Sequence, residues 1–292
     1  MIIFSRIFMK NSNELLKAHD WFNKEDLKVV WNNDSDGIFC AGFLEEFKGW
    51  KPFSYYDFNQ MVLDNTYIVD GNITVTKNEI VYVDVAIEGN KRTIDMHITK
   101  ISHDDKTNPN SLNPNHHIAR NNYTDKCAWG AIIAILSYIN YDFSVLSDEA
   151  KMILWGVDSG FLSYFFNSNT FYKWVEFYGV QELASVFSKY NKSDFEKVQY
   201  KYGLQGTIKT NKDGYIYTTG VQKKSGWCPA INFKAIQEYF PFVKLPETKQ
   251  TPYDIGLQSK KFDCNSTKSK HDLGCVFSFA LNGKQYGQYS IR

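Results

Sequence analysis

The sequence predicts an α/β protein in which a parallel sheet comes first and a smaller mixed α+β domain follows. Residues 27–32 form an apolar, β-branched run, and a helix-forming run at 38–47 follows it, as in parallel sheets. Two further strand-like runs lie at 79–87 and 92–98. Beyond about residue 192, short strand-like runs are separated by glycines, which favours a second, mixed domain.

The middle of the chain predicts a loop and two helices. Residues 102–125 are polar and rich in Asn and Pro, as loops are. Apolar residues at helical spacing in 126–139 predict a buried helix. A further helix is expected at 147–155, and the glycines of 156–160 predict a turn that exposes Asp158.

The chain length allows one large domain or two small ones, and we expect two. The first domain would comprise residues 1–190 and carry the parallel sheet. The second would comprise residues 191–292, with strands at 215–219 and 275–281.

The composition of the chain neither supports nor excludes a nucleic-acid partner. The net charge of +1 gives no overall attraction to nucleic acid, so a polyanion would have to bind at a local patch. The 22 Phe, 19 Tyr and 7 Trp residues can serve as core or as stacking platforms for bases, and core is the default interpretation.

Cysteine usage and the N-terminus favour a soluble, cytoplasmic protein with no membrane partner. The cysteines are five in number and form no CxxC pair, which indicates reduced thiols rather than a disulfide framework or a zinc site. The apolar segment 1–9 is interrupted by Arg6, is followed by Lys10 and has no cleavage pattern, so we expect no export. No run of about 18 apolar residues predicts a membrane span.

Acidic and imidazole side chains lie near the ends of the predicted strands. Asp34 and Asp36 follow the first strand, Asp84 lies in the second, and Asp95 and His97 lie in the third. Ligands collect at the carboxyl edge of an open parallel sheet, so these side chains are expected to share one rim. Carboxylate and imidazole ligands together suit manganese, magnesium or zinc.

Each of these positions also has a structural interpretation. The run Asp-Ser-Asp-Gly at 34–37 is typical of a turn. Asp84 can mark a solvated strand end, and His97 can belong to a strand with alternating exposure. The order of the positions and their shared location at strand ends favour a metal site.

Taken together, these runs resemble the DHH phosphoesterases, in particular the branch that contains the RecJ single-strand exonucleases and the oligoribonucleases. Residues 29–38, a strand followed by Asp-x-Asp-Gly, are similar to the first motif of that family, and Val83-Asp84 is similar to the second. Asp95-Met96-His97 lies where the Asp-His-His motif is expected.

The resemblance continues through about residue 160. Leu112-Asn113-Pro114 and the following run 127–131 are similar to the Asn-Pro loop and the small-residue helix of RecJ-like members. Residues 153–160 look like the fourth motif, whose aspartate is Asp158 here.

The resemblance implies roles for these residues around two divalent ions, Mn²⁺ or Mg²⁺. Asp34 would help to hold one ion, Asp36 and Asp158 would hold the other, and Asp84 would bridge both. His97 would contact the scissile phosphate, and Asp95 would support the site from behind.

The chain departs from the family at imidazole and carboxylate positions. Met96 replaces the first histidine of the motif, and a thioether is a poor ligand for hard divalent ions. Asn32 stands where RecJ-like members have aspartate, and Val30 where others have histidine. Our hypothesis is that His116 or His117 supplies a substitute ligand, and the alternative is that both lie in a solvated loop.

The second half is only weakly similar to the family, because its glycine-rich GGH-type motif is absent. Arg292 and the pairs Lys260-Lys261 and Lys223-Lys224 are candidates for binding substrate phosphates, or are solvated residues. The aromatic residues of segment 167–190 could stack bases or form helical core.

The sequence therefore predicts a metal-dependent phosphodiesterase, a hydrolase that acts as a nuclease or exonuclease on single-stranded nucleic acid or short oligonucleotides. One alternative is a cyclic dinucleotide phosphodiesterase. Another is a catalytically impaired protein of the same fold that binds a nucleotide or a protein partner. A third is a DNA-binding structural protein unrelated to the family.

Overall fold

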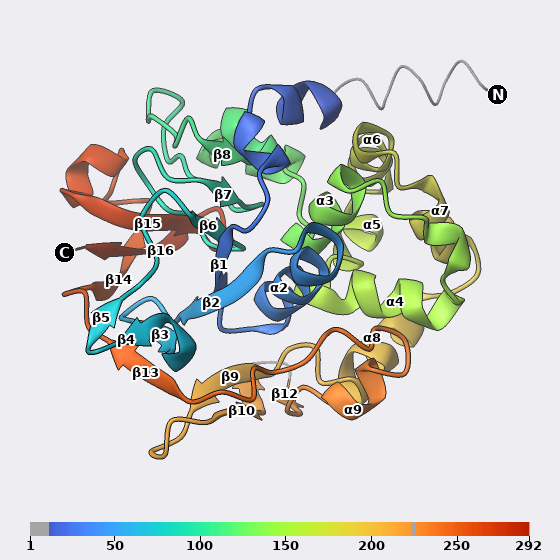
Figure 1. Cartoon of the computed structure of the whole chain (residues 1–292). Coiled ribbons are helices and arrows are strands. Elements are labelled where there is room, and N and C mark those ends of the chain that lie inside the picture. Colours follow the sequence, from blue (N-terminus) through green and yellow to red (C-terminus); the bar gives the residue numbers. More distant parts are fainter. Residues whose placement is uncertain (1–11, 224–225, 292) are drawn as a thin grey trace.

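In the computed structural model, strand β1 (Lys28–Asn32) lies at the centre of a seven-stranded sheet with the order β13-β3-β2-β1-β6-β7-β8 (Figure 1). The neighbours of β1 on both sides run parallel to it, and so do β7 and β8 beyond β6. On the other side of the sheet, β3 runs antiparallel to both of its neighbours, β2 and the edge strand β13. The other strands of this sheet are β2 (Lys51–Tyr56), β3 (Met61–Asp64), β6 (Ile80–Val83), β7 (Thr93–Ile94), β8 (Ser111–Leu112) and β13 (Gln250–Tyr253). The predicted α/β class is confirmed.

The structure describes residues 12–223 and 226–291. The predictions made for the apolar segment 1–9, for Lys224 and for Arg292 lie outside the described residues. In the part of the chain that is described, no helix has both the length and the apolar character needed to cross a membrane.

Apolar residues alternate between the two faces of the sheet, and both faces are covered. Val29 and Trp31 point into the main core, which contains helix α2 (Ser35–Lys48). Val30 and Tyr82 belong to a second core on the opposite face. A strand that is buried on both faces reads as a continuous apolar run, which is why residues 27–32 are recognisable from sequence.

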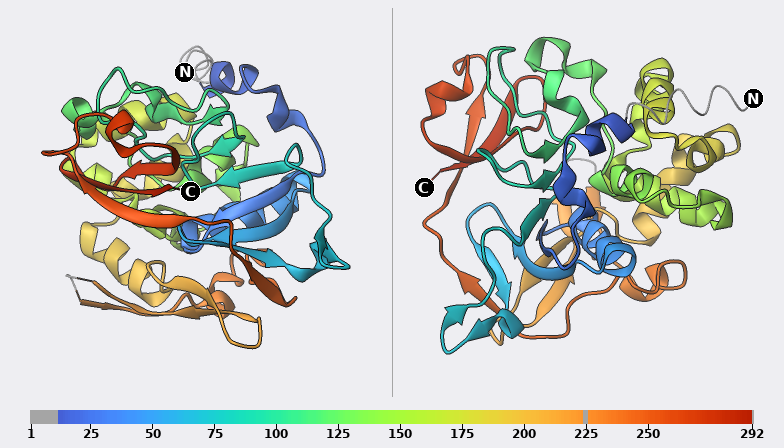
Figure 2. Two further views of the ribbon diagram at one scale, coloured as in Figure 1. Left: turned by 90° about the vertical axis from the view of Figure 1, so that its left-hand side faces the viewer. Right: turned by 45° about the horizontal axis from the view of Figure 1, so that its top comes forward.

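The helices lie mainly beside the sheet, and α3 to α7 form one side of the molecule (Figures 1 and 2). Besides α2, the α-helices are α3 (Ala131–Tyr138), α4 (Asp148–Gly156), α5 (Leu162–Phe166), α6 (Ser168–Tyr178), α7 (Gln181–Ala184), α8 (Lys192–Lys201) and α9 (Phe233–Ile236). The predicted helices at 38–47 and 147–155 are confirmed. The helix predicted at 126–139 begins later, at Ala131, because Gly130 before it is extended and serves as the N-cap residue.

Smaller antiparallel sheets occupy much of the C-terminal part, where the sequence predicted short strands in a mixed domain. Their strands are β9 (Thr207–Thr210), β10 (Ile216–Thr219), β11 (Val221–Lys223), β12 (Gly226–Cys228), β14 (Gln258–Asp263), β15 (Val276–Leu281) and β16 (Tyr286–Ile291), and a short pair is β4 (Ile68–Val69) with β5 (Asn72–Ile73). Strand β13 also crosses back to pair with β3 in the central sheet. The domain boundary at residue 190 stays a prediction.

Two local expectations need correction. The predicted strand 79–87 is shorter in the structure, because Asp84 adopts a left-handed conformation with φ of 54° directly after β6. The predicted strand 92–98 is reduced to β7, Thr93–Ile94. The polar segment 102–125 contains β8 and the 3₁₀ helices η3 (Pro114–His117) and η4 (Arg120–Asp125) in addition to loop. Asn and Pro are common both in loops and in short 3₁₀ turns, so the composition of this segment does not distinguish the two.

Gly37 allows β1 and α2 to approach each other closely. A Cβ atom at this position would lie 2.1 Å from the backbone oxygen of Asn32 and 2.6 Å from its nitrogen. Gly49, the C-cap of α2, has φ of 68° but open space around its Cα atom. The two glycines therefore serve different needs, steric room at Gly37 and a left-handed backbone at Gly49.

We expect Gly37→Ala to lower the free energy of unfolding by about 3 kcal/mol or more, because backbone atoms of β1 must move. Gly49→Ala is the control and should cost only about 1 kcal/mol for its left-handed conformation. Urea unfolding of both variants measures the difference. Equal losses would show that the close approach at Gly37 is not a constraint.

Candidate metal centre

Asp34 and Asp36 lie at the start of α2, where the chain turns out of β1. Asp34 is the N-cap residue, and its Oδ1 accepts a hydrogen bond from the Gly37 backbone N–H at 3.1 Å. Its Oδ2 accepts a hydrogen bond from Asn32 Nδ2 at 2.6 Å. Burial, followed by the charge of Asp158, raises the pKa of Asp34 to about 6.

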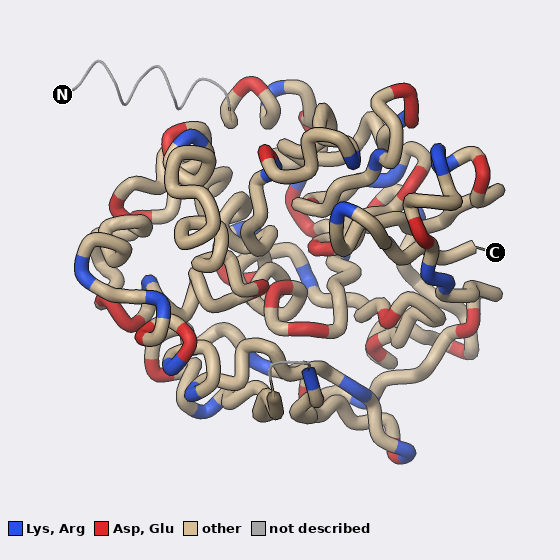
Figure 3. Tube along the Cα trace, turned by 180° about the vertical axis from the view of Figure 1, so that it is seen from behind, with Lys and Arg blue, Asp and Glu red and all other residues tan. Residues whose placement is uncertain are grey.

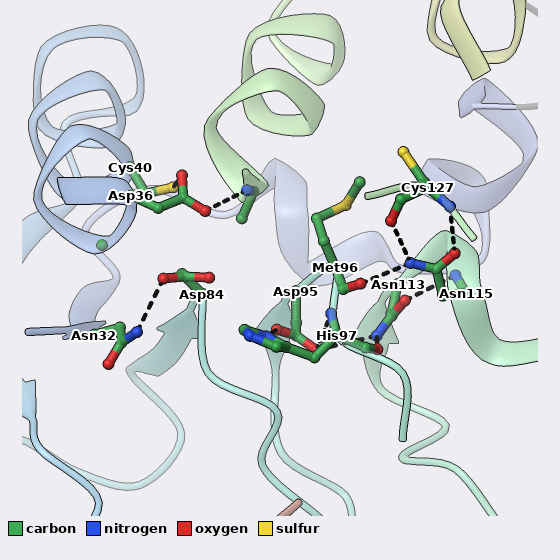
Figure 4. A network of polar contacts seen from close by, with 12 residues as sticks. Asn32, Asp36, Cys40, Asp84, Asp95, Met96, His97, Asn113, Asn115 and Cys127 are labelled. Atoms are coloured by element: carbon green, nitrogen blue, oxygen red, sulfur yellow. Dashed lines mark hydrogen bonds and ion pairs between the residues drawn. The ribbon is translucent and has the colours of Figure 1, made fainter. Parts of the chain in front are cut away.

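Asp36 joins two helices. Its side chain is fully buried and accepts hydrogen bonds from the backbone N–H groups of Ala131 and Ile132, the latter at 3.0 Å (Figure 4). These groups belong to the first turn of α3, where a carboxylate is favourable. Gly130 permits the approach, because a Cβ atom there would lie 2.8 Å from Asp36 Oδ1. Burial and then the charges of Asp158 and Asp34 raise the pKa of Asp36 to about 8.

Asp84 is a buried carboxylate that follows directly after β6. Its left-handed backbone directs it away from the strand, and only 2% of the residue is exposed. Asn32 Nδ2 donates a hydrogen bond to its Oδ2 at 3.2 Å, whereas its buried Oδ1 has no hydrogen-bond partner among the described residues. Burial and the neighbouring carboxylates, Asp36 first among them, raise its pKa well above the usual value. A buried carboxylate oxygen without a partner is costly unless a cation or a proton satisfies it.

His97 is held by Asp95. Asp95 is fully buried, and its Oδ1 lies 2.7 Å from His97 Nδ1, while its Oδ2 accepts a hydrogen bond from the His97 backbone N–H at 3.1 Å. Burial lowers the pKa of His97, because it disfavours the charged imidazole. The charge of the Asp95 carboxylate and its hydrogen bond have the larger effect and raise the pKa to about 9. The side chain of His97 is 31% exposed, so its other face can reach a ligand.

The loop after β8 fixes the segment that carries His97. Asn113 Nδ2 donates hydrogen bonds to Asp95 Oδ2 at 3.0 Å and to the His97 carbonyl at 2.8 Å. Asn115, which is fully buried, donates to the carbonyls of Met96 and Cys127 and accepts from the Cys127 N–H (Figure 4). The sequence prediction missed Asn115, although an Asn that follows Asn-Pro in a polar loop is a signal for such side-chain bonds.

Asp158 reaches the site from the turn after α4. It lies in the 3₁₀ helix η6 (Val157–Ser159), is exposed and has φ of 51°, and Ser159 has φ of 57°. The side-chain amides of Gln199 and Gln205 each donate a hydrogen bond to Ser159 Oγ, at 2.9 and 2.8 Å. Consecutive left-handed residues of this kind are strained and persist where the surroundings hold them, commonly at functional sites.

The side chains form two groups that could hold a metal ion, and Asp84 belongs to both. One group is Asp36, Asp84 and Asp158, and the other is Asp84, Asp95 and His97. Within each group the potential ligand atoms all lie within 4.8 Å of one another. The donor set of carboxylates and one imidazole suits hard divalent ions such as Mn²⁺ and Mg²⁺.

The remaining predicted residues lie outside these two groups. Asp34 is adjacent to them, and both of its oxygens accept the hydrogen bonds described above. Met96 is buried in the main core, where the Tyr178 hydroxyl lies 3.8 Å from its sulfur. His116 and His117 lie in η3, and neither is in a group of potential ligands within the described ranges. Their role as substitute ligands stays a prediction.

The site opens to a hollow of about 330 Å³. His97 and Asp158 line it together with Lys126 and residues of the loop before α3. The hollow therefore offers an anionic ligand the ammonium group of Lys126 and the imidazole of His97, beside the carboxylate of Asp158.

Comparison of the chain with known protein families, with curated proteins and with solved structures finds no match.

The raised pKa values predict how pH and metal affect stability. The folded, metal-free protein keeps Asp34 protonated up to about pH 6 and Asp36 up to about pH 8, whereas the unfolded chain releases these protons near pH 4. This contribution to stability is complete below about pH 4 and is lost as pH rises through 6 and 8. We therefore expect the melting temperature in EDTA to fall between about pH 5 and pH 9.

Manganese should reverse this loss, because a bound cation requires ionised carboxylates. Its stabilising effect should be larger at about pH 8 than at about pH 5. Thermal unfolding with EDTA or Mn²⁺ across this range is the measurement. A metal-free melting temperature that rises steadily to pH 9, with no response to Mn²⁺, would contradict the assignment.

Proposed function

We propose that the protein is a metal-dependent phosphodiesterase of the DHH type that acts on single-stranded nucleic acid or short oligonucleotides. The observation that carries this proposal is the position of Asp84. It is shared by two groups of potential metal ligands, and its buried Oδ1 lacks a partner among the described residues.

The residues fit two hard divalent cations, Mn²⁺ or Mg²⁺. Asp36, Asp84 and Asp158 would hold one, and Asp84 and Asp95 would contribute to the other, either with a neutral His97 as the third ligand or with His97 beside it as the contact to the phosphate. Asp34 would act from beside them. A pair of such ions, when bound, stabilises charge on the attacking and leaving oxygens of a phosphoryl displacement.

The protein's own groups position the substrate. With its pKa raised to about 9, the imidazole of His97 is a cation at neutral pH in the metal-free protein, and Asp95 fixes its orientation. A protonated imidazole can donate a hydrogen bond to a phosphoryl oxygen and stabilise its charge. Asn113 in turn positions Asp95 through a hydrogen bond of 3.0 Å.

A local anion site agrees with the charge distribution. Basic and acidic residues are interspersed over the described trace (Figure 3), and the net charge of the chain is only +1. Lys126, in the hollow that also contains His97, is the basic side chain next to the carboxylates. A short, single-stranded substrate that enters a hollow fits this arrangement better than a duplex bound across a broad basic surface.

A second candidate function is a protein of the same fold that binds a nucleotide or a protein partner without catalysis. Asn32 favours it, because a neutral amide lies between Asp34 and Asp84, at 2.6 and 3.2 Å, where an aspartate would add a ligand. The buried Met96 likewise supplies no imidazole. Calorimetric binding of a nucleotide in EDTA, together with no hydrolysis in Mn²⁺, would favour this function over the first.

The first test of the enzyme is hydrolysis of labelled single-stranded oligonucleotides with Mn²⁺. Asp84→Asn should lower kcat by at least about 100-fold, because the shared carboxylate charge is lost. Asn keeps the size of the side chain and tolerates the left-handed backbone, so folding should be retained. If no phosphodiester is cleaved by the wild type with any divalent metal, the enzymatic proposal fails.

His97→Gln distinguishes two roles of the imidazole. If it contacts the phosphate, kcat should fall by about 100-fold or more while the Mn²⁺ dissociation constant changes little. Calorimetry with Mn²⁺ and steady-state kinetics on the same preparation measure both quantities. A large loss of Mn²⁺ affinity would instead identify His97 as a metal ligand.

A further inference from the structure

A second hollow, of about 310 Å³, adjoins the one that contains His97 and Asp158. The two hollows share the residues Tyr123, Lys126, Ala128, Trp129, Leu162 and Ser163. They therefore lie side by side, and a ligand with its phosphate near Asp158 and His97 can reach over the shared residues towards the second hollow.

The second hollow is lined mainly by aromatic and apolar side chains. Phe166, Phe171 and Trp174 complete a wall begun by Tyr123 and Trp129. Phe166 is 73% exposed, so its ring contributes little to the protein's own core. An exposed aromatic ring at the mouth of a concave, aromatic-lined site indicates a ligand surface.

The two indoles of this wall are fixed by hydrogen bonds. Trp129 Nε1 donates to Ser163 Oγ at 3.0 Å, and Trp174 Nε1 donates to the Asp125 carbonyl at 3.1 Å. Trp129 is only 2% exposed, so the half-buried Trp174 and the exposed Phe166 are the rings that can stack on a flat ligand.

Lys126 marks the boundary between the polar and the aromatic hollow. Its Nζ donates to the Tyr123 hydroxyl at 3.0 Å and lies 4.5 Å from the centre of that ring. An ammonium group between a carboxylate centre and an aromatic wall suits a ligand whose phosphate is joined to a planar ring system.

We infer that the aromatic hollow binds the nucleobase of the terminal nucleotide, whose phosphate lies at the carboxylate centre. The ligand class is a nucleoside phosphate at the end of a single strand. This inference rests on the proposed function for the position of the phosphate. The volume fits one nucleoside rather than a peptide helix, and stacking gives affinity for any base.

The test compares adenosine 5′-monophosphate with ribose 5-phosphate, which lacks the base, by calorimetry on the full chain with Mn²⁺. The nucleotide should bind at least about 5-fold more tightly, as expected for one stacked base. Phe166→Ala should reduce this preference about 5-fold, and Leu162→Ala, at a residue that is 41% exposed, should reduce it to a smaller extent. Tyr172→Ala is the matched control, because Tyr172 is 44% exposed and does not line the hollow.

Equal affinities for the two ligands, or a base preference unchanged in Phe166→Ala and Leu162→Ala, would overturn the inference. Oligonucleotide hydrolysis measured on the same variants separates it from the proposed function. If the wild type and Phe166→Ala hydrolyse the oligonucleotide equally well, the base site is rejected and the proposed enzyme is not. Base-dependent binding without cleavage of any phosphodiester rejects the enzyme and leaves the base site standing.

Discussion

The mutual repulsion of the carboxylates around Asp84 is the constraint on which the site depends. Burial and the charges of its neighbours raise the pKa of Asp84, and both effects disfavour several ionised groups in one place. The surroundings offset part of this cost through the first turn of α3 at Asp36, the Asn32 amide at Asp84 and the imidazole at Asp95. Divalent cations, bound as we propose, would offset the rest.

The fold supplies this arrangement through the ends of parallel strands and a few unusual backbone positions. Strands β1 and β6 are neighbours, so Asp34 and Asp84, which follow them, emerge at the same edge of the sheet. The left-handed conformations of Asp84 and Asp158 turn the chain at the site. The side chains of Asn113 and Asn115 then fix the segment that contains His97. Helix N-termini, turns and side-chain amides from distant parts of the chain, Gln199 and Gln205 among them, therefore come together to form the site.

The sequence predicted those parts that depend on local pattern. The buried strand 27–32, the helix after it and the carboxylates at strand ends follow from apolar periodicity and from the position of charges. It did not predict β2, which begins with Lys51 and Pro52 and shows its apolar face only late in the strand. The bonds of Asn115 and the core position of Met96 were also missed, because they depend on partners far away, Cys127 and Tyr178. Whether an aromatic residue of segment 167–190 is core or a stacking surface also depends on residues far away in the sequence, so the sequence left both interpretations open. In the structure Phe171 is buried, and Trp174 lines a hollow.

The central claim is that Asp84 is shared by two divalent cations. Anomalous X-ray diffraction from crystals of the protein soaked in Mn²⁺ tests it most directly. We expect anomalous peaks on both sides of the Asp84 carboxylate, one towards Asp36 and Asp158 and one towards Asp95 and His97. A fully soaked crystal with no peak at Asp84, or with manganese only at surface carboxylates, would contradict it.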